Sequence, residues 1–169
     1  PLKPGDFDLA EGYWCITVVR NPVERLISAY GNRVVREKDH LASRKRALTG
    51  LFKGLKLNPT PDQFFERLDG YQENSRSILY HTFNQTEFLG HDISKFDAVF
   101  QMEDSQALAV ALTNQLGRQV ELPHMRKEKK KLQLADLSDK AQATILDYTK
   151  PDYTLLQDYY AKPSQQVAA

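Results

Sequence analysis

The sequence predicts an α/β domain in which a parallel sheet is flanked by helices. Two short runs rich in aromatic and β-branched residues, 13–19 (YWCITVV) and 96–101 (FDAVFQ), read as buried strands. A helical pattern follows each run directly, and this alternation is typical of strands joined by crossover helices. Neither an internal repeat nor a linker interrupts the 169 residues, so we expect residues 1–169 to form a single domain.

The first strand is continuous in apolar character, as in parallel strands that are covered on both faces. A helix should begin just after it, because Asn21 suits an N-cap, Pro22 the first helical position and Glu24 the third. One face of this helix is predicted to be buried. It carries Val23, Leu26, Ile27, Tyr30 and Val34.

Residues 33–56 differ from their surroundings in charge. They contain eight Lys or Arg residues and two acidic residues, a local excess of six positive charges. Two interpretations stay open, a solvated helix or loop and a surface for an anionic acceptor or nucleotide.

Further helices are predicted where a capping or turn residue precedes an apolar periodic segment. Gly70 is expected to end the first of these helices, and Gly117 the third. Residues 162–169 should be a frayed tail. The predicted helix starts lie near Thr60, Ser75, Asp104 or Ser105, Ser138 and Pro151.

Composition narrows the classes of function. The formal net charge is only +1, so we expect no nucleic-acid partner, and any anion site must arise from local clustering. The apolar runs are too short for a membrane span. Cys15 is the only cysteine, which excludes an intrachain disulfide and a cysteine-based zinc site, and we expect no metal.

The stretch VVRNPVERLISAY, residues 18–30, combines features of an anion site. Arg20 follows the first strand, at the end of a parallel sheet where ligands bind, and the next helix points its positive end there. Ser28 lies seven residues after Asn21, about two helical turns, and therefore on the same side of the helix. Alone, each is an ordinary surface residue. Together, a guanidinium fork and a hydroxyl suit a phosphate monoester.

This stretch resembles the 3′-phosphate-binding motif of sulfotransferases that use 3′-phosphoadenosine 5′-phosphosulfate (PAPS), especially the carbohydrate branch. The resemblance implies the sulfotransferase fold, related to P-loop kinases, with Arg20 and Ser28 binding the 3′-phosphate. It also implies transfer of a sulfuryl group from PAPS to a hydroxyl of a carbohydrate or other small acceptor. Later segments follow the same family order: HTFNQTEFLG, FDAVFQMEDSQAL, LPH and YTKPDYTLLQDYY.

Two parts of the chain depart from that resemblance. The family's loop around the 5′-phosphosulfate is not found, because neither G-x-x-x-x-G-K-[ST] nor K-x-G-[ST]-[ST] occurs. We therefore expect an N-terminally incomplete chain, inactive as it stands, with a degenerate relative as the alternative. In LPHMRKE, Arg126 and Lys127 are expected to bind the nucleotide or to be solvated charges, and Glu128 stands where a hydroxyl is common.

The resemblance requires a base for the acceptor hydroxyl but no metal. His81 is the first candidate, because histidine titrates near neutral pH. Glu103, just past the second strand, is another, and related enzymes often place the base upstream of the first strand. Gln85 is expected to position the base or the acceptor.

Two other functions remain open at this level. A P-loop phosphotransferase relative would require a Walker lysine and Mg²⁺, and a non-catalytic module would bind polyanions or nucleotides through the basic segments. The partners expected are the nucleotide donor and a hydroxyl acceptor, possibly an anionic glycan. We expect a cytoplasmic protein, or a Golgi lumenal one if the chain is a truncated lumenal domain. The sequence does not specify the oligomeric state.

Overall fold

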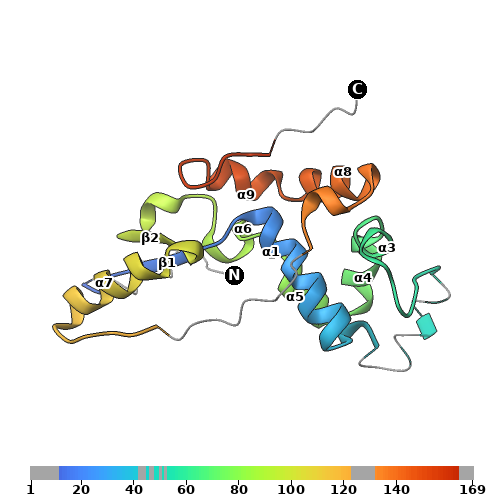
Figure 1. Cartoon of the computed structure of the whole chain (residues 1–169), viewed down its shortest axis with the longest axis horizontal. Coiled ribbons are helices and arrows are strands. Elements are labelled where there is room, and N and C mark those ends of the chain that lie inside the picture. Colours follow the sequence, from blue (N-terminus) through green and yellow to red (C-terminus); the bar gives the residue numbers. More distant parts are fainter. Residues whose placement is uncertain are drawn as a thin grey trace.

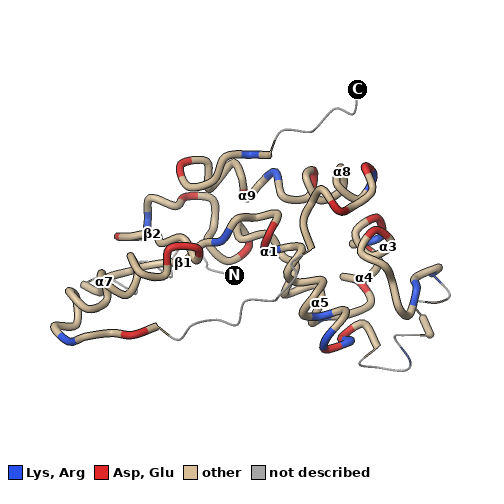
Figure 2. The backbone as a smooth tube through the Cα atoms, in the orientation of Figure 1, with Lys and Arg blue, Asp and Glu red and all other residues tan. Residues whose placement is uncertain are grey.

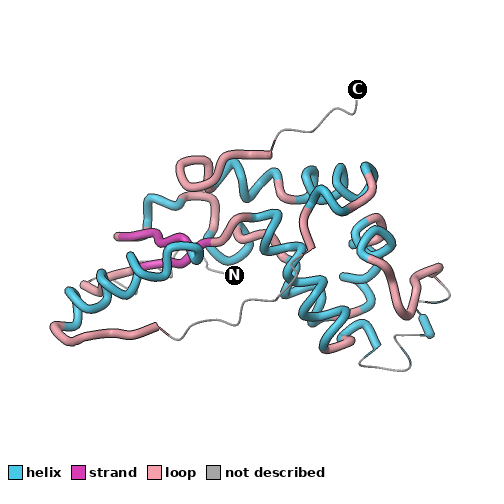
Figure 3. The backbone as a smooth tube through the Cα atoms, in the orientation of Figure 1, coloured by secondary structure: helices cyan, strands magenta, loops and turns pink. Residues whose placement is uncertain are grey.

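The computed structural model describes residues 12–41, 45, 48, 49, 51, 53–122 and 132–163. Two strands, β1 (Ile16–Val19) and β2 (Ala98–Gln101), pair in parallel, with Ile16 opposite Ala98 and Val19 opposite Gln101. Helices make up most of the remainder (Figure 3). The predicted α/β class, a parallel sheet flanked by helices, is therefore confirmed.

Helix α1 (Pro22–Ala29) begins where the sequence predicts it. The Asn21 side chain accepts a hydrogen bond from the Glu24 amide at 3.1 Å, and Pro22 occupies the first turn. A π-helical segment, Tyr30–Arg36, continues the same direction. The predicted apolar face is buried along its whole length, from Val23 to Val34.

The other described helices lie around α1, and one of them lies beside the strands (Figure 1). Among the described residues, four short 3₁₀ turns lie between these elements: Asp39–Leu41, Ile93–Lys95, Met102–Asp104 and Leu134–Asp136. The helices are α3 (Pro61–Phe65), α4 (Leu68–Asn74), α5 (Arg76–Thr82), α6 (Thr86–Leu89), α7 (Ser105–Leu116), α8 (Asp139–Tyr148) and α9 (Lys150–Leu155).

The buried apolar side chains form one cluster around α1. Helix α1 contacts α5 and α8. Tyr30, the first residue of the π-helical segment, packs against two aromatic side chains of α3. The Tyr30 ring centroid lies 5.4 Å from that of Phe64 and 5.8 Å from that of Phe65. The described residues thus share one continuous core. That residues 1–169 form a single domain stays a prediction.

One predicted helix end is wrong. Gly70 lies inside α4, which continues to Asn74. A Cβ atom at position 70 would lie 2.9 Å from Leu55 Cδ2. Glycine is therefore used here for close packing against Leu55 rather than for ending the helix. Gly117 ends α7 as predicted, in the left-handed conformation with φ of 63°.

The first strand was expected to be covered on both faces, and this is also wrong for the described chain. Val18 is 42% exposed, and no residue of β2 is fully buried. Among the described helices α7 packs most extensively along β2, and α7 itself contains no buried residue. The strand is apolar in sequence, but within the described chain only one of its ends reaches the core, at Val19.

Some predictions fall outside the residues that the structure describes. These include Arg126 and Lys127, residues 42–44, 46, 47, 50 and 52 of the basic segment, and residues 164–169 of the expected tail. Within the described ranges, no helix combines the length and apolar character needed to cross a membrane.

Candidate active site

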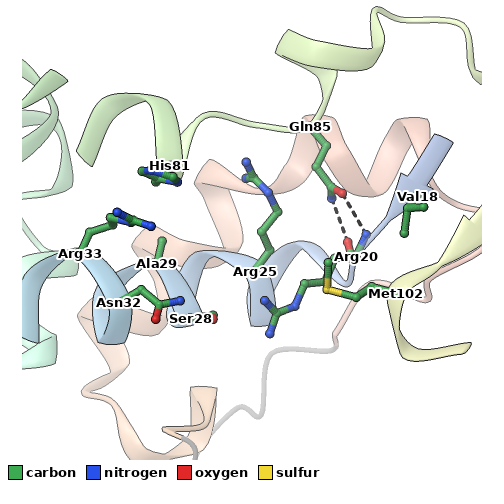
Figure 4. A pocket seen from close by; sticks show the side chains of 10 residues that line it. All are labelled: Val18, Arg20, Arg25, Ser28, Ala29, Asn32, Arg33, His81, Gln85 and Met102. Carbon is green, nitrogen blue, oxygen red and sulfur yellow. Dashed lines mark hydrogen bonds between the residues drawn. The ribbon is translucent and has the colours of Figure 1, made fainter. Parts of the chain in front are cut away.

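A cavity of about 230 Å³ opens beside α1, at the carboxyl end of β1 (Figure 4). Three arginines line it, Arg20, Arg25 and Arg33, together with Ser28 and His81. None of the ten described residues that line the cavity is acidic. A cationic cavity without lining carboxylates favours an anionic ligand.

Arg20 and Ser28 face this cavity together, as the sequence predicts. Arg20 follows β1 directly, and Ser28 lies in the last turn of α1, opposite the buried face of that helix. Figure 4 shows the Arg20 guanidinium directed along α1 toward Ser28. No described carboxylate forms an ion pair with Arg20. The Arg20 guanidinium can therefore bind an anion from solution.

The backbone of Arg20 is held by a residue far along the chain. The Arg20 amide donates to Gln85 Oε1 at 2.9 Å, and Gln85 Nε2 donates to the Arg20 carbonyl at 2.8 Å. Gln85 thus lines the cavity, as predicted, but its amide already bonds the backbone of Arg20. To contact an acceptor directly, Gln85 would have to use its second N–H donor or the second lone pair of its amide oxygen.

Arg25 lies on the side of the cavity nearest α5 and α6 (Figure 4). Its Nη1 donates to the Phe83 carbonyl, and its Cζ lies 5.9 Å from the centre of the Phe88 ring. Burial lowers the pKa of the Arg25 guanidinium, and the charge of Asp152 opposes that change. These fixed partners make Arg25 a positive charge of the cavity wall rather than a freely moving side chain.

His81 reaches the cavity from α5, near Arg33 (Figure 4). Partial desolvation lowers the pKa of His81 below its ordinary value of 6.5, and the charge of Arg33 lowers it further. Asp39, which pairs with Arg33 at 3.6 Å, opposes the shift. His81 is therefore neutral at pH 7 and can accept a proton there.

Glu103 does not line the cavity. Its Oε1 accepts from the Asn21 amide at 3.3 Å, and its Oε2 accepts from the Tyr160 hydroxyl at 2.5 Å. Both oxygens therefore join the end of β2 to the start of α1 and to the segment after α9. The structure thus separates the two candidate bases, and of the two only His81 lines the cationic cavity.

Three polar lining residues were not singled out from the sequence as site residues: Arg25, Asn32 and Arg33. The spacing contains a signal for two of them, since Arg25 and Asn32 lie three residues before and four after Ser28, on one helical face. The position of Arg33 depends on the π-helical segment, which sequence periodicity does not predict. Figure 2 shows basic positions recurring from the end of β1 through α1 and this segment.

Two other predictions have a simpler outcome. Arg126 and Lys127 lie outside the described residues. In the part of the chain that is described, no group of three or more His, Cys, Asp or Glu residues is arranged to hold a metal ion.

A family model described as "Sulfotransferase family" matches residues 6–161, which include every element described above. The chain belongs to the sulfotransferase family. No curated protein and no solved structure matches this sulfotransferase. As a member of the family it is an enzyme that transfers a sulfuryl group from a donor to an acceptor. The cavity at the end of β1 carries the positive charge that suits an anionic sulfate donor.

Proposed function

We propose that this sulfotransferase uses PAPS as the donor and a hydroxyl of a carbohydrate or other small molecule as the acceptor. The observation that carries the proposal is the shared orientation of Arg20 and Ser28 into one cationic cavity. A forked guanidinium and a hydroxyl donor match the oxygens of a phosphate monoester, such as the 3′-phosphate of PAPS.

The size of the cavity fits part of a nucleotide. Its volume of about 230 Å³ is below the roughly 300–1,000 Å³ of sites that enclose a whole drug-sized ligand. The described cavity would thus enclose only part of the nucleotide, and in this proposal that part is the 3′-phosphate with its neighbouring ribose atoms. In this proposal Arg20 and Ser28 bind the phosphate oxygens, and Arg25 adds positive charge behind them.

The acceptor would approach from the end of the cavity formed by Asn32, Arg33 and His81. PAPS supplies the sulfuryl group. Neutral His81 would accept the proton that the acceptor hydroxyl loses, as a general base. The charge of Arg33 supports an acceptor that carries an anionic group, as an acidic or already sulfated glycan does.

The cytoplasmic location expected from the sequence stays a proposal.

The donor assignment is tested by calorimetry with 3′,5′-adenosine bisphosphate and 5′-AMP. Both ligands share the adenosine and the 5′-phosphate, so the ratio of their affinities isolates the 3′-phosphate. Arg20→Ala should lower that ratio at least about tenfold, since a hydrogen bond to a charged group contributes about 1.5–3 kcal/mol. Gln85 bonds the backbone of Arg20 and not its side chain, so these two hydrogen bonds remain possible in the variant.

Arg36→Ala is a matched control. Arg36 ends the π-helical segment, pairs with Glu37 at 2.8 Å and does not line the cavity. It should leave the ratio unchanged. An Arg20→Ala protein with the wild-type ratio would exclude the assigned phosphate site. Wild-type protein that binds both ligands equally would favour a general polyanion module, and Mg²⁺-dependent phosphoryl transfer would favour a phosphotransferase.

A further inference from the structure

We propose that Gln85 is a positioning residue, which aims the Arg20 guanidinium at the phosphate by fixing the Arg20 backbone. This inference rests on the proposed function, because the phosphate is that of the nucleotide donor. It assigns Gln85 a role that acts through Arg20, in place of the direct substrate contact expected from the sequence.

The first argument is where Arg20 lies relative to the sheet. The pairing of β1 with β2 ends at Val19 and Gln101, so Arg20 is one residue beyond it. Gln85 bonds both the N–H and the C=O of Arg20, at 2.9 and 2.8 Å, as a peptide group of a neighbouring strand would. Two bonds to one residue restrict its peptide planes and therefore the direction of its Cα–Cβ bond.

The second argument is that Gln85 is itself held in place. Gln85 is only 6% exposed and directly precedes α6. The next amide, that of Thr86, donates to Asp152 Oδ1 at 3.0 Å. Asp152 belongs to α9 and is 2% exposed, so the turn before α6 is fixed by a buried carboxylate. The Gln85 amide therefore has a rigid base from which to hold Arg20.

The third argument is chemical. The clamp needs one acceptor and one donor on the same planar group, and the glutamine amide supplies both. An ionised glutamate accepts only, so it would face the Arg20 carbonyl without a proton between them. A protonated glutamate has the shape of glutamine and supplies an acceptor and an O–H donor. Replacement by glutamate therefore makes the clamp dependent on pH.

The experiment measures the affinity ratio for 3′,5′-adenosine bisphosphate over 5′-AMP in Gln85→Glu, Gln85→Leu and wild-type protein. The measurements run from about pH 5 to about pH 9, on either side of the pKa range of buried carboxyl groups. At the basic end both variants should show a ratio about fivefold below wild type, as expected for a lost hydrogen bond. At the acidic end Gln85→Glu should return to the wild-type ratio, and Gln85→Leu should not.

Wild-type protein at each pH corrects for protonation of the ligand phosphates. Gln72→Glu is the matched control, because Gln72 is also partly buried and its amide bonds Thr82 and Tyr148 rather than Arg20. It should keep the wild-type ratio at every pH. If Gln85→Leu does not fold, the pH dependence of Gln85→Glu alone decides.

A wild-type ratio in Gln85→Glu at the basic end would overturn the inference, as would an equal loss at all pH values. A wild-type protein without any preference for the 3′-phosphate would instead overturn the proposed function. The two failures are therefore distinguishable.

Discussion

The turn between β1 and α1 and the helix α7 both adjoin the sheet, yet they are held in different ways. Val19, just before the turn, is fully buried, and the Tyr160 hydroxyl, which shares its single proton between Glu103 Oε2 and the Val19 carbonyl, lies 3.2 Å from that carbonyl. In the turn, Tyr153 donates to Asn21 Oδ1 at 3.2 Å. In α7 no residue is buried, although seven of its twelve residues are Ala, Val or Leu. The apolar content of a segment therefore does not show how firmly it is fixed.

This difference indicates that the cavity beside Arg20 is supported mainly by the helical core. Residues from the turn before α6, from α9 and from the segment after α9 bond the β1–α1 connection that carries Arg20, whereas α7 packs chiefly on β2. Regions with many buried contacts open only at high free-energy cost, and regions with few open easily. The cavity should therefore depend strongly on the helical core and weakly on α7.

The largest expected effect is on the helical core. Phe64 is fully buried, and its ring centroid lies within 5.4 Å of those of Tyr30, Phe65 and Tyr71. Phe64→Ala should lower the free energy of unfolding by about 3–5 kcal/mol, measured by urea denaturation. On α7, Val110 is 53% exposed, and Val110→Ala should change it by less than about 0.5 kcal/mol. Equal losses of unfolding free energy in the two variants would contradict the conclusion that α7 is fixed less firmly than the helical core.

A smaller effect is expected at the helix caps. Asn21 accepts from the Glu24 amide and from Tyr153, whereas Asp104 accepts from the Ala107 amide at the start of α7. Asn21→Ala should lower the free energy of unfolding by about 1–2 kcal/mol, and Asp104→Ala by about 0.5 kcal/mol. Thermal and urea unfolding of the two variants sharpen the comparison, and the reverse order would contradict it.

The smallest expected change is electrostatic, inside the cavity. The pKa of His81 is lowered first by desolvation and then by Arg33, so removing the Arg33 charge should raise it toward 6.5. Protonation of His81 would then begin at higher pH, and any acidic loss of activity that depends on neutral His81 should move upward as well. NMR titration of His81 in Arg33→Gln measures the shift.

Arg76→Gln is the control for that titration. Arg76 is on the same helix as His81, but it lies over the Tyr80 ring at 5.7 Å and outside the cavity lining. It should leave the pKa of His81 as in wild type. A His81 pKa that is unchanged or lowered in Arg33→Gln would show that the cavity does not impose its charge on this histidine.

The parts of the fold that the sequence predicted depend on local signals. Asn21, Thr60 and Ser138 each accept a hydrogen bond from the amide three residues later, and the spacing of capping residues reveals this directly. The Arg20 and Ser28 pair was predictable for the same reason, because helix geometry places residues two turns apart on one side.

The parts that could not be predicted depend on contacts between distant residues. The role of Gly70 follows from Leu55, and the role of Gln85 follows from Arg20, 65 positions away. The exposure of Val18 depends on which elements cover the strand, and its own apolar character says nothing about that. Periodicity and capping residues report only on the segment in which they occur. The roles of these residues depend on partners elsewhere in the chain, which local patterns do not reveal.

The hydrogen bond from Tyr160 to Val19 joins residues that are 141 positions apart. During synthesis the strand and α1 are made well before the tyrosine that contacts them. Domains fold as units once their parts have emerged. Until Tyr160 has been synthesised, the turn after β1 therefore lacks this support.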